Sequence, residues 1–397
     1  MMATVEAVLI RNGNVFSPDE LGRVDLLIIA GRVVKIGRGL RLPEGLDGED
    51  YDLDGFFVLP GLVDGHIHIF GGTGEFGPRL VPRPLSAADI VGAGITTVVG
   101  VLGYDDVSAT LAGVLVRSRV LKAQGISAYM FTGSFRCPGP SLTGSMYQDI
   151  ILIPEVLGVK VAISEPASSH PDVVTLSRMA GECAAAGLAA GKPGITHVHT
   201  GNGPEGLQPL LDLIERSGLS PSQIIPTHVN GSRRRVEQAA AYVKKGGIID
   251  LTATLAPEYG GDRYVKPARA VSSLIANGAD PSRVTLSSDS NIIDPVLAMT
   301  SGQVLHIVGP DALLTELRAI IRDGSLPMAK SIALATANPA RALGLFPHKG
   351  VIIPGADADL TVLDQDLNLR RVFARGRLLW SEGKPTSDTL KGTEVII

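Results

Sequence analysis

The stretch Leu59-Pro-Gly-Leu-Val-Asp-Gly-His-Ile-His-Ile-Phe70 organises the interpretation of the chain, because it has the pattern of a buried strand that ends in two histidines. Side chains alternate across a strand, so His66 and His68 are predicted to point the same way. Two neutral imidazoles at one strand end suit a borderline-soft divalent cation such as zinc. A His-x-His pair alone is common, so the metal hypothesis depends on what the rest of the chain supplies.

The composition is typical of a globular protein of enzyme size. The chain has 397 residues, of which 45% are hydrophobic and 19% charged, enough for one large domain and a smaller one. Its net charge is -4, and the one basic cluster is Arg233-Arg234-Arg235, so neither nucleic acid nor a membrane is indicated as a partner. Cys137 and Cys183 show no CxxC spacing, and no uncharged apolar run reaches the length of a membrane span. We expect a cytoplasmic protein that acts on a small-molecule substrate.

Short β segments at the two ends of the chain are expected to pack together. Neither end is long enough to form a core alone. We predict a small β-sandwich domain built from residues 1–58 and 347–397, with residues 59–346 inserted between them. The segments expected to form strands are 7–10, 24–29 and 32–36 near the start and 358–363, 371–374 and 377–380 near the end.

The inserted part alternates apolar strand-like runs with alanine-rich helical patterns, which is typical of βα units around a parallel sheet. Eight such runs predict an α/β fold with a closed (β/α)8 TIM-like barrel, whose reactive groups lie at the carboxyl ends of the strands. The runs are 63–67, 96–101, 127–132, 158–163, 195–199, 224–228, 248–251 and 284–288.

Polar side chains that can bind a metal or move a proton gather at the ends of five of these runs. Beyond His66 and His68, they are Lys160, His199, His228 and Asp289. So many polar groups at one end of an apolar barrel indicate a functional site rather than core filling. Lys160 lies on an apolar strand, where a lysine finds a partner, loses its charge or extends its amine to the surface.

These motifs resemble the amidohydrolase superfamily and, within it, the isoaspartyl (β-aspartyl) dipeptidases, almost from end to end. Motifs shared with the superfamily are Pro60-Gly-Leu-Val-Asp64 and Pro354-Gly-Ala-Asp-Ala-Asp-Leu360. Motifs that resemble the dipeptidases more specifically are Gly71-Gly-Thr-Gly-Glu75, Val98-Val-Gly-Val-Leu-Gly103, Gly158-Val-Lys-Val-Ala-Ile-Ser164, Gly191-Lys-Pro-Gly194, Pro226-Thr-His-Val-Asn230 and Thr285-Leu-Ser-Ser-Asp289.

The resemblance implies a centre with two divalent metal ions, usually zinc. One ion would be held by His66, His68 and Asp289, the other by His199 and His228, and a carboxylated Lys160 would bridge the two. A hydroxide between the metals would attack an amide bond, and Asp289 would accept its proton and pass it to the leaving amine. His197 is expected to be structural. The family also implies a homo-oligomer, such as an octamer.

The substrate side departs from the family. Thr73, Glu75, Tyr104 and Phe135 are the expected substrate contacts, with Glu75 matching a residue that holds the α-amino group of the substrate. Phe135 stands where the dipeptidases have a tyrosine that supports the oxyanion, and Tyr104 stands where they have a threonine. Ala167 and Gly231 occupy the places of two arginines that bind substrate carboxylates. Arg136 or the Arg233–Arg235 run offers a replacement, although such a run is more typical of a solvated helix face.

Three functions therefore compete. The first is hydrolysis of an amide, including an isoaspartyl dipeptide, which would make the protein a metalloprotease. The second is hydrolysis of a cyclic amide, a lactone or an N-acyl group by a related two-metal enzyme. The third is a non-catalytic barrel that serves as a scaffold, which the complete set of expected metal ligands disfavours.

Overall fold

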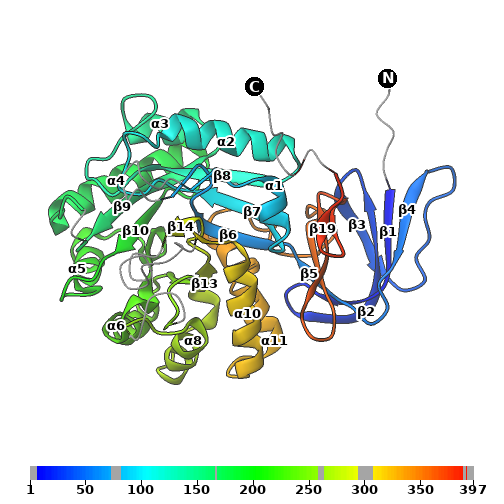
Figure 1. The fold of residues 1–397 in the computed structure, drawn as a ribbon. Helices are drawn as coiled ribbons and strands as arrows, with labels where there is room; N and C mark the ends of the chain where they lie inside the picture. The colour runs from blue at the N-terminus through cyan, green and yellow to red at the C-terminus, as the bar shows by residue number, and fades with distance from the viewer. Residues whose placement is uncertain are drawn as a thin grey trace.

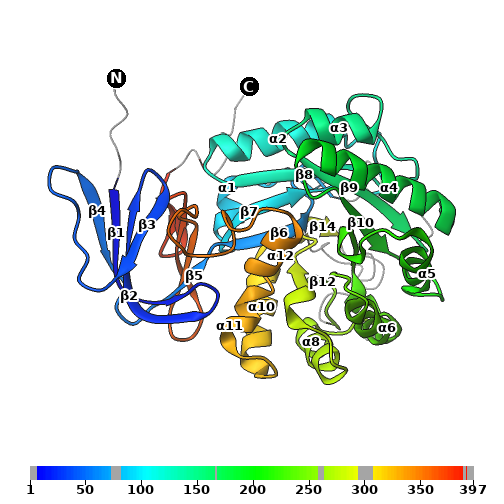
Figure 2. The same ribbon diagram turned by 180° about the vertical axis from the view of Figure 1, so that it is seen from behind.

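The computed structural model describes residues 7–72, 82–165, 168–257, 263–293, 307–387 and 390. Figures 1 and 2 show a barrel of strands wrapped by helices, with a sheet formed by both ends of the chain beside it. No helix within those ranges is long and apolar enough to cross a membrane.

Strands from both ends of the chain pair in one nine-stranded sheet, as the sequence predicted for these segments. Strand β16 lies antiparallel to β5, which in turn runs parallel to β1. All nine strands join a single sheet, so a sandwich of two separate sheets is not confirmed. The strands are β1 (Ala7–Phe16), β2 (Glu20–Ile29), β3 (Arg32–Gly37), β4 (Gly48–Asp52), β5 (Phe57–Pro60), β16 (Leu360–Leu363), β17 (Leu369–Ala374), β18 (Arg377–Ser381) and β19 (Lys384–Pro385).

Two tight hairpins shape this sheet. Ala30 and Gly31 between β2 and β3 have φ of 51° and 76°, and Arg375 and Gly376 between β17 and β18 have φ of 48° and 74°. Two-residue turns with positive φ match the right-handed twist of paired strands, and glycine adopts that conformation without strain. The two turns meet, because a Cβ on Gly31 would lie 3.2 Å from the Cβ of Arg375.

The sequence suggested that the stretch from Leu59 to Phe70 forms one strand. In the structure it contains parts of two. Strand β5 ends at Pro60 in the terminal sheet, and β6 begins at Leu62 in the barrel. The break is at Gly61, where a Cβ would lie 2.9 Å from the Cβ of Thr96. Only a glycine fits so close to the neighbouring strand. The domain boundaries at residues 58 and 346 stay a prediction.

Each of the eight runs predicted for the barrel forms a strand. Six of them make a parallel sheet in the order β11-β10-β9-β8-β7-β6, curled as a TIM-like half-barrel, and β12 and β13 form a parallel pair that continues it. All eight residues of β9 are buried, which fits a strand covered on both faces. The strands are β6 (Leu62–Ile67), β7 (Ile95–Gly100), β8 (Ser127–Gly133), β9 (Val156–Ile163), β10 (Ile195–Thr200), β11 (Ile224–Thr227), β12 (Ile249–Thr252) and β13 (Val284–Ser287).

Helices cover the outside of the barrel in both views (Figures 1 and 2). Helix α4 shows how local sequence sets their limits: Asp172 accepts a hydrogen bond from the backbone N–H of Thr175 at its start, and Gly191 ends it with φ of 64°. The principal helices are α1 (Ala87–Val91), α2 (Leu111–Ala123), α3 (Met146–Leu152), α4 (Val173–Ala190), α5 (Gln208–Ser217), α6 (Arg233–Lys244), α8 (Pro267–Ala276), α10 (Asp311–Asp323), α11 (Met328–Ala333) and α12 (Ala337–Ala342).

Two seams interrupt the strand pairing of the barrel, one between β13 and β6 and one between β11 and β12. At the first seam, the backbone N–H of Asp289 donates to the carbonyl of His66 at 2.9 Å. Further along, the N–H of Val63 donates to the carbonyl of Ala335 at 2.8 Å, so the chain after α11 fills the rest of the gap.

At the second seam a side chain takes the place of a strand. The Oδ1 of Asn230 accepts a hydrogen bond from the backbone N–H of Thr252 at 2.8 Å. Its Nδ2 lies 3.0 Å from the carbonyl oxygen of Thr252, 2.8 Å from that of Leu255 and 3.1 Å from that of Val265. Asn230 is fully buried and pairs with Thr252 as a peptide group would.

A buried carboxyl ties the same seam together inside the barrel. Asp250 on β12 accepts hydrogen bonds from Thr227 on β11 at 2.7 Å and from Thr285 and Ser287 on β13, both at 2.6 Å. Burial raises the pKa of Asp250 to about 6, against the three hydroxyl donors that lower it.

Candidate metal centre

The expected metal ligands lie at or near the carboxyl ends of barrel strands. His66 is on β6 and His68 follows it, Lys160 is on β9 and His199 on β10. His228 directly follows β11, and Asp289 comes two residues after β13. Of the expected substrate contacts, Thr73 and Glu75 lie outside the described residues, as does the replaced position Ala167.

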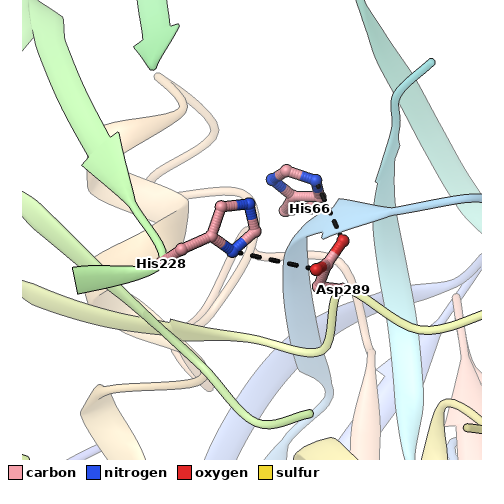
Figure 3. A group of neighbouring side chains, drawn as sticks. All are labelled: His66, His228 and Asp289. Atoms are coloured by element: carbon pink, nitrogen blue, oxygen red, sulfur yellow. Dashed lines mark ion pairs between the residues drawn. The ribbon is translucent and has the colours of Figure 1, made fainter. Parts of the chain in front are cut away.

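Two of these side chains sit on left-handed backbone. His228 has φ of 62° and Asp289 has φ of 51°, a conformation rare for residues with a Cβ. Such residues are concentrated at functional sites, where the surrounding structure holds them in place. The turn of the chain at these residues aims both side chains toward β6 (Figure 3).

The centre of the site is a carboxylate that lies beside several imidazoles, of which Figure 3 draws His66 and His228. Asp289 Oδ1 lies 3.2 Å from Nε2 of His66 and 3.3 Å from Nε2 of His68. Its Oδ2 lies 3.7 Å from Nδ1 of His228. Potential ligand atoms of His66, His228 and Asp289 all lie within 4.8 Å of one another, which is close enough to share one cation.

The two remaining expected ligands border this group. The rings of His199 and His228 lie 4.3 Å apart between centroids. Lys160 Nζ lies 3.3 Å from Nε2 of His66 and donates a hydrogen bond to the carbonyl of Leu102 at 2.7 Å. The structure thus brings all six predicted residues into one neighbourhood.

Burial sets the protonation of the histidines. It lowers the pKa of His66 to about 3, and it also lowers the pKa values of His68, His197, His199 and His228. We call these five residues the histidine cluster. The neutral imidazoles keep lone pairs available for a cation.

Asp289 stays ionised beside them. Burial opposes its ionisation, but His228, His66 and His68 outweigh burial and hold the pKa of the carboxyl well below its ordinary range. The site therefore offers one carboxylate among neutral nitrogen donors.

This donor set fits a divalent transition metal. His68 Nε2 lies 3.3 Å from Asp289 Oδ1, and it is buried and makes no hydrogen bond within the described part of the chain. Buried polar atoms in proteins nearly always have a partner, so an unpaired ring nitrogen next to a carboxylate indicates a place for a cation. Nitrogen and carboxylate donors together are typical of zinc sites.

Phe135 covers one side of the centre. Its ring centroid lies 4.3 Å from that of His199, and Lys160 Nζ lies 5.1 Å from it. The Tyr104 ring packs beside Phe135, with centroids 6.2 Å apart. The next residue, Arg136, is held by Asp106 through bonds of 2.8 and 2.7 Å, so it is engaged in fixing the loop.

The solvated-face interpretation of the arginine run does not hold for Arg235. Arg233 and Arg234 are exposed, but Arg235 is only 3% exposed. Its guanidinium donates to the carbonyl of Gly201 at 2.9 Å, and its Cζ lies 2.8 Å from where a Cβ on Gly231 would be. Burial lowers the pKa of Arg235 to about 10. Gly231 therefore makes room for a guanidinium that enters from α6.

Two residues that the sequence interpretation did not assign to the metal centre lie beside it. His197, expected to be structural, places Nε2 at 2.8 Å from Nδ1 of His66. Glu165, which follows β9, places Oε2 at 3.8 Å from Nε2 of His199. The alternation used for His66 and His68 applies equally to His197 and His199, and it was the available signal for His197.

Comparison with known proteins places this geometry in a family. A sequence model described as the amidohydrolase family matches residues 227–379. The crystal structure of the β-aspartyl dipeptidase from Fervidobacterium islandicum AW-1, in complex with the β-Asp-Leu dipeptide, is similar with a TM-score of 0.87 and 33% identity. The match covers 97% of this chain and 99% of that one.

Curated relatives carry other names. Adenine deaminase 3 of Rhizobium meliloti is 26% identical over 405 residues, and the chain spans only 59% of its length. A dihydroorotase of Geobacter metallireducens is 24% identical, with 90% of this chain and 89% of that protein covered.

Proposed function

The chain belongs to the amidohydrolase superfamily, and from that premise we propose that it is a metal-dependent hydrolase of the isoaspartyl dipeptidase type, which cleaves an amide bond. The observation that carries the proposal is the convergence of six metal-directed side chains at one end of the barrel, in a chain 33% identical to a β-aspartyl dipeptidase over 97% of its length.

The proposed ligands fall into two groups. His66, His68 and Asp289 would hold one divalent ion, and His199 and His228 would hold the second, with a carboxylated Lys160 between them. Two bound cations supply the polarisation that makes water nucleophilic at neutral pH. Their identity as zinc is part of the proposal, and metal analysis of the purified protein tests it.

Asp289 moves the proton in this proposal. Its ionised carboxylate lies among the neutral imidazoles, so it can accept a proton from the attacking water and deliver it to the leaving nitrogen. The left-handed backbone at Asp289 fixes the direction of the carboxylate, and the hydrogen bond from its N–H to the His66 carbonyl holds that backbone. The proton is therefore carried by a group that the fold keeps in place.

The first substrate class we propose is a β-linked aspartyl dipeptide. The F. islandicum relative was solved with such a dipeptide bound. Glu75 would hold the α-amino group, and Thr73, Tyr104 and Phe135 would line the rest of the site. A homo-oligomer in the cytoplasm completes the proposal, and the assembly can be tested by analytical ultracentrifugation.

One observation favours a second class, the cyclic amides, lactones or N-acyl compounds. Phe135 packs directly on His199, at the position where the dipeptidases carry a tyrosine hydroxyl, and a phenyl ring donates no hydrogen bond. Loss of one oxyanion donor raises a barrier by about 3 kcal/mol, or roughly 100-fold in rate. Dipeptide turnover should then be slow unless another group replaces the hydroxyl.

The deciding experiment measures hydrolysis of β-Asp-Leu by zinc-loaded protein, with α-Asp-Leu alongside and with Phe135→Tyr as the matched variant. Turnover of the β isomer alone supports the dipeptidase class. Slow turnover that Phe135→Tyr raises supports the same class with an impaired oxyanion site. Absence of turnover in both proteins with metal bound supports the second class, and absence of bound metal supports a scaffold.

A further inference from the structure

His197 lies behind the metal centre, on the far side of the His66 ring. The two ring nitrogens of His66 face different partners. Nε2 faces Asp289 Oδ1 at 3.2 Å, whereas Nδ1 faces Nε2 of His197 at 2.8 Å. One imidazole therefore touches the reactive carboxylate and a second imidazole at once.

The position of His197 is fixed by the barrel. It is 4% exposed and lies on β10, in register with Lys160 of β9 and Ile225 of β11. Its ring stacks on Phe131 of β8, with centroids 5.0 Å apart and planes 19° from parallel. The ring thus has little freedom to turn away from His66.

We propose that His197 is a positioning residue, which accepts the Nδ1 proton of His66 and so leaves the Nε2 lone pair of His66 available to a cation beside Asp289. This inference rests on the proposed metal site. A histidine that ligates a metal through one nitrogen needs the proton on the other, and the hydrogen-bond partner of that second nitrogen fixes both the tautomer and the ring orientation.

The partner in this chain is a neutral imidazole, where many metal sites use a carboxylate. A neutral acceptor orients His66 without adding negative charge to the barrel interior. A neutral amide oxygen should therefore replace it. Glutamine at position 197 can offer such an oxygen near the place of Nε2, whereas phenylalanine keeps the stacked ring and offers none.

The test measures zinc affinity of the metal-free full-length protein by chelator competition, without reference to turnover. His197→Phe should weaken one zinc site by about 10- to 100-fold, the range typical for loss of such a partner. His197→Gln should recover most of that affinity. Phe131→Leu, which removes the stacking but keeps the acceptor, should change it by no more than about threefold. His197→Leu serves for the same comparison if His197→Phe does not fold.

Three outcomes would overturn the inference. An affinity of His197→Phe within about twofold of the wild type would show that His66 needs no partner. Equal weakening in Phe131→Leu would assign the effect to packing, and no recovery in His197→Gln would exclude the hydrogen bond as its cause. In each case the wild type still takes up zinc, so the proposed function stands. A wild type that takes up no zinc refutes the proposed function itself, and this inference with it.

Discussion

Replacement of Asn230 by alanine should destabilise the protein strongly, although Asn230 touches no proposed ligand-binding atom. The change removes the side chain that bridges β11 and β12 at the second seam. It leaves the buried N–H and carbonyl of Thr252 and the partly buried carbonyls of Leu255 and Val265 without this partner. Each buried backbone group left unpaired costs about 1–3 kcal/mol, and relaxation recovers part of it. We therefore expect a loss of about 3 kcal/mol in the free energy of unfolding.

Asn230→Asp separates hydrogen bonding from packing, because it replaces the side-chain NH2 donor by an oxygen and leaves the shape of the side chain almost unchanged. An aspartate still accepts from the Thr252 N–H, but its second oxygen faces carbonyl oxygens instead of donating to them. The penalty relative to the wild type should be larger at pH 8, where the carboxyl is driven to ionise, than at pH 5.

Urea denaturation of the metal-free protein measures both effects, and Asn277→Ala is the control. Asn277 also donates a side-chain hydrogen bond, to the Ser273 carbonyl at 2.8 Å, but it is exposed. That control should stay within about 0.5 kcal/mol of the wild type. A loss below about 1 kcal/mol for Asn230→Ala would mean that water or a shift of the strands replaces the side chain, and the seam interpretation would be wrong.

Three further predictions concern the site. Asp289→Asn should lower kcat at least 100-fold and leave KM within a few-fold of the wild-type value, since the carboxylate moves a proton. Steady-state kinetics at a metal content matched to the wild type measure both constants, and a kcat close to that of the wild type would contradict the prediction. Gly231→Ala should displace the Arg235 guanidinium and lower the melting temperature, as the new Cβ overlaps it; an unchanged melting temperature would show that Arg235 moves freely. The metal-free protein should lose stability from pH 7 to pH 5, because unfolding exposes the histidine cluster to protonation below about pH 6.5. Asp64 and Asp250, whose pKa values are raised to about 7 and about 6 by burial, oppose this, but five histidines outnumber two carboxyls. Calorimetry at several pH values measures this change. A melting temperature that rises on acidification would refute the predicted loss of stability.

The barrel strands could be predicted from the sequence because they are buried on both faces and read as apolar runs without alternation. The proposed ligands could be predicted for the same reason, since a histidine or lysine stands out at the end of such a run. Strand β4 gave no signal: four of its five residues, Gly48-Glu-Asp-Tyr-Asp52, are exposed, and it is held by backbone pairing to β1. Pairing of that kind leaves no pattern in the side chains.

The particular hydrogen bonds and close approaches that join distant segments could not be predicted from the sequence. Asn230 lies in a recognisable motif and Asp250 in a predicted strand, but their hydrogen-bond partners depend on which strands become neighbours. The close approach of Thr96 that requires Gly61 also appears only in three dimensions, so one apolar stretch was taken for one strand. The strands on either side of Gly31 and Gly376 could be predicted because each pair is joined by a tight turn between segments adjacent in sequence.

Because of the two seams, a metal ion bound at the proposed site would also affect the stability of the barrel. Asp289 and His66 lie on opposite sides of the first seam, and His228 borders the second. The side chains that would bind one ion therefore come from sheets that do not pair strand to strand. A cation bound at the proposed site would therefore add to the hydrogen bonds that already join the edges of the first seam. A ligand that binds only the folded form stabilises it by about 2.7 kcal/mol at 100 times its dissociation constant. An ion bound for the proposed chemistry would thereby also hold together the strands that carry its ligands.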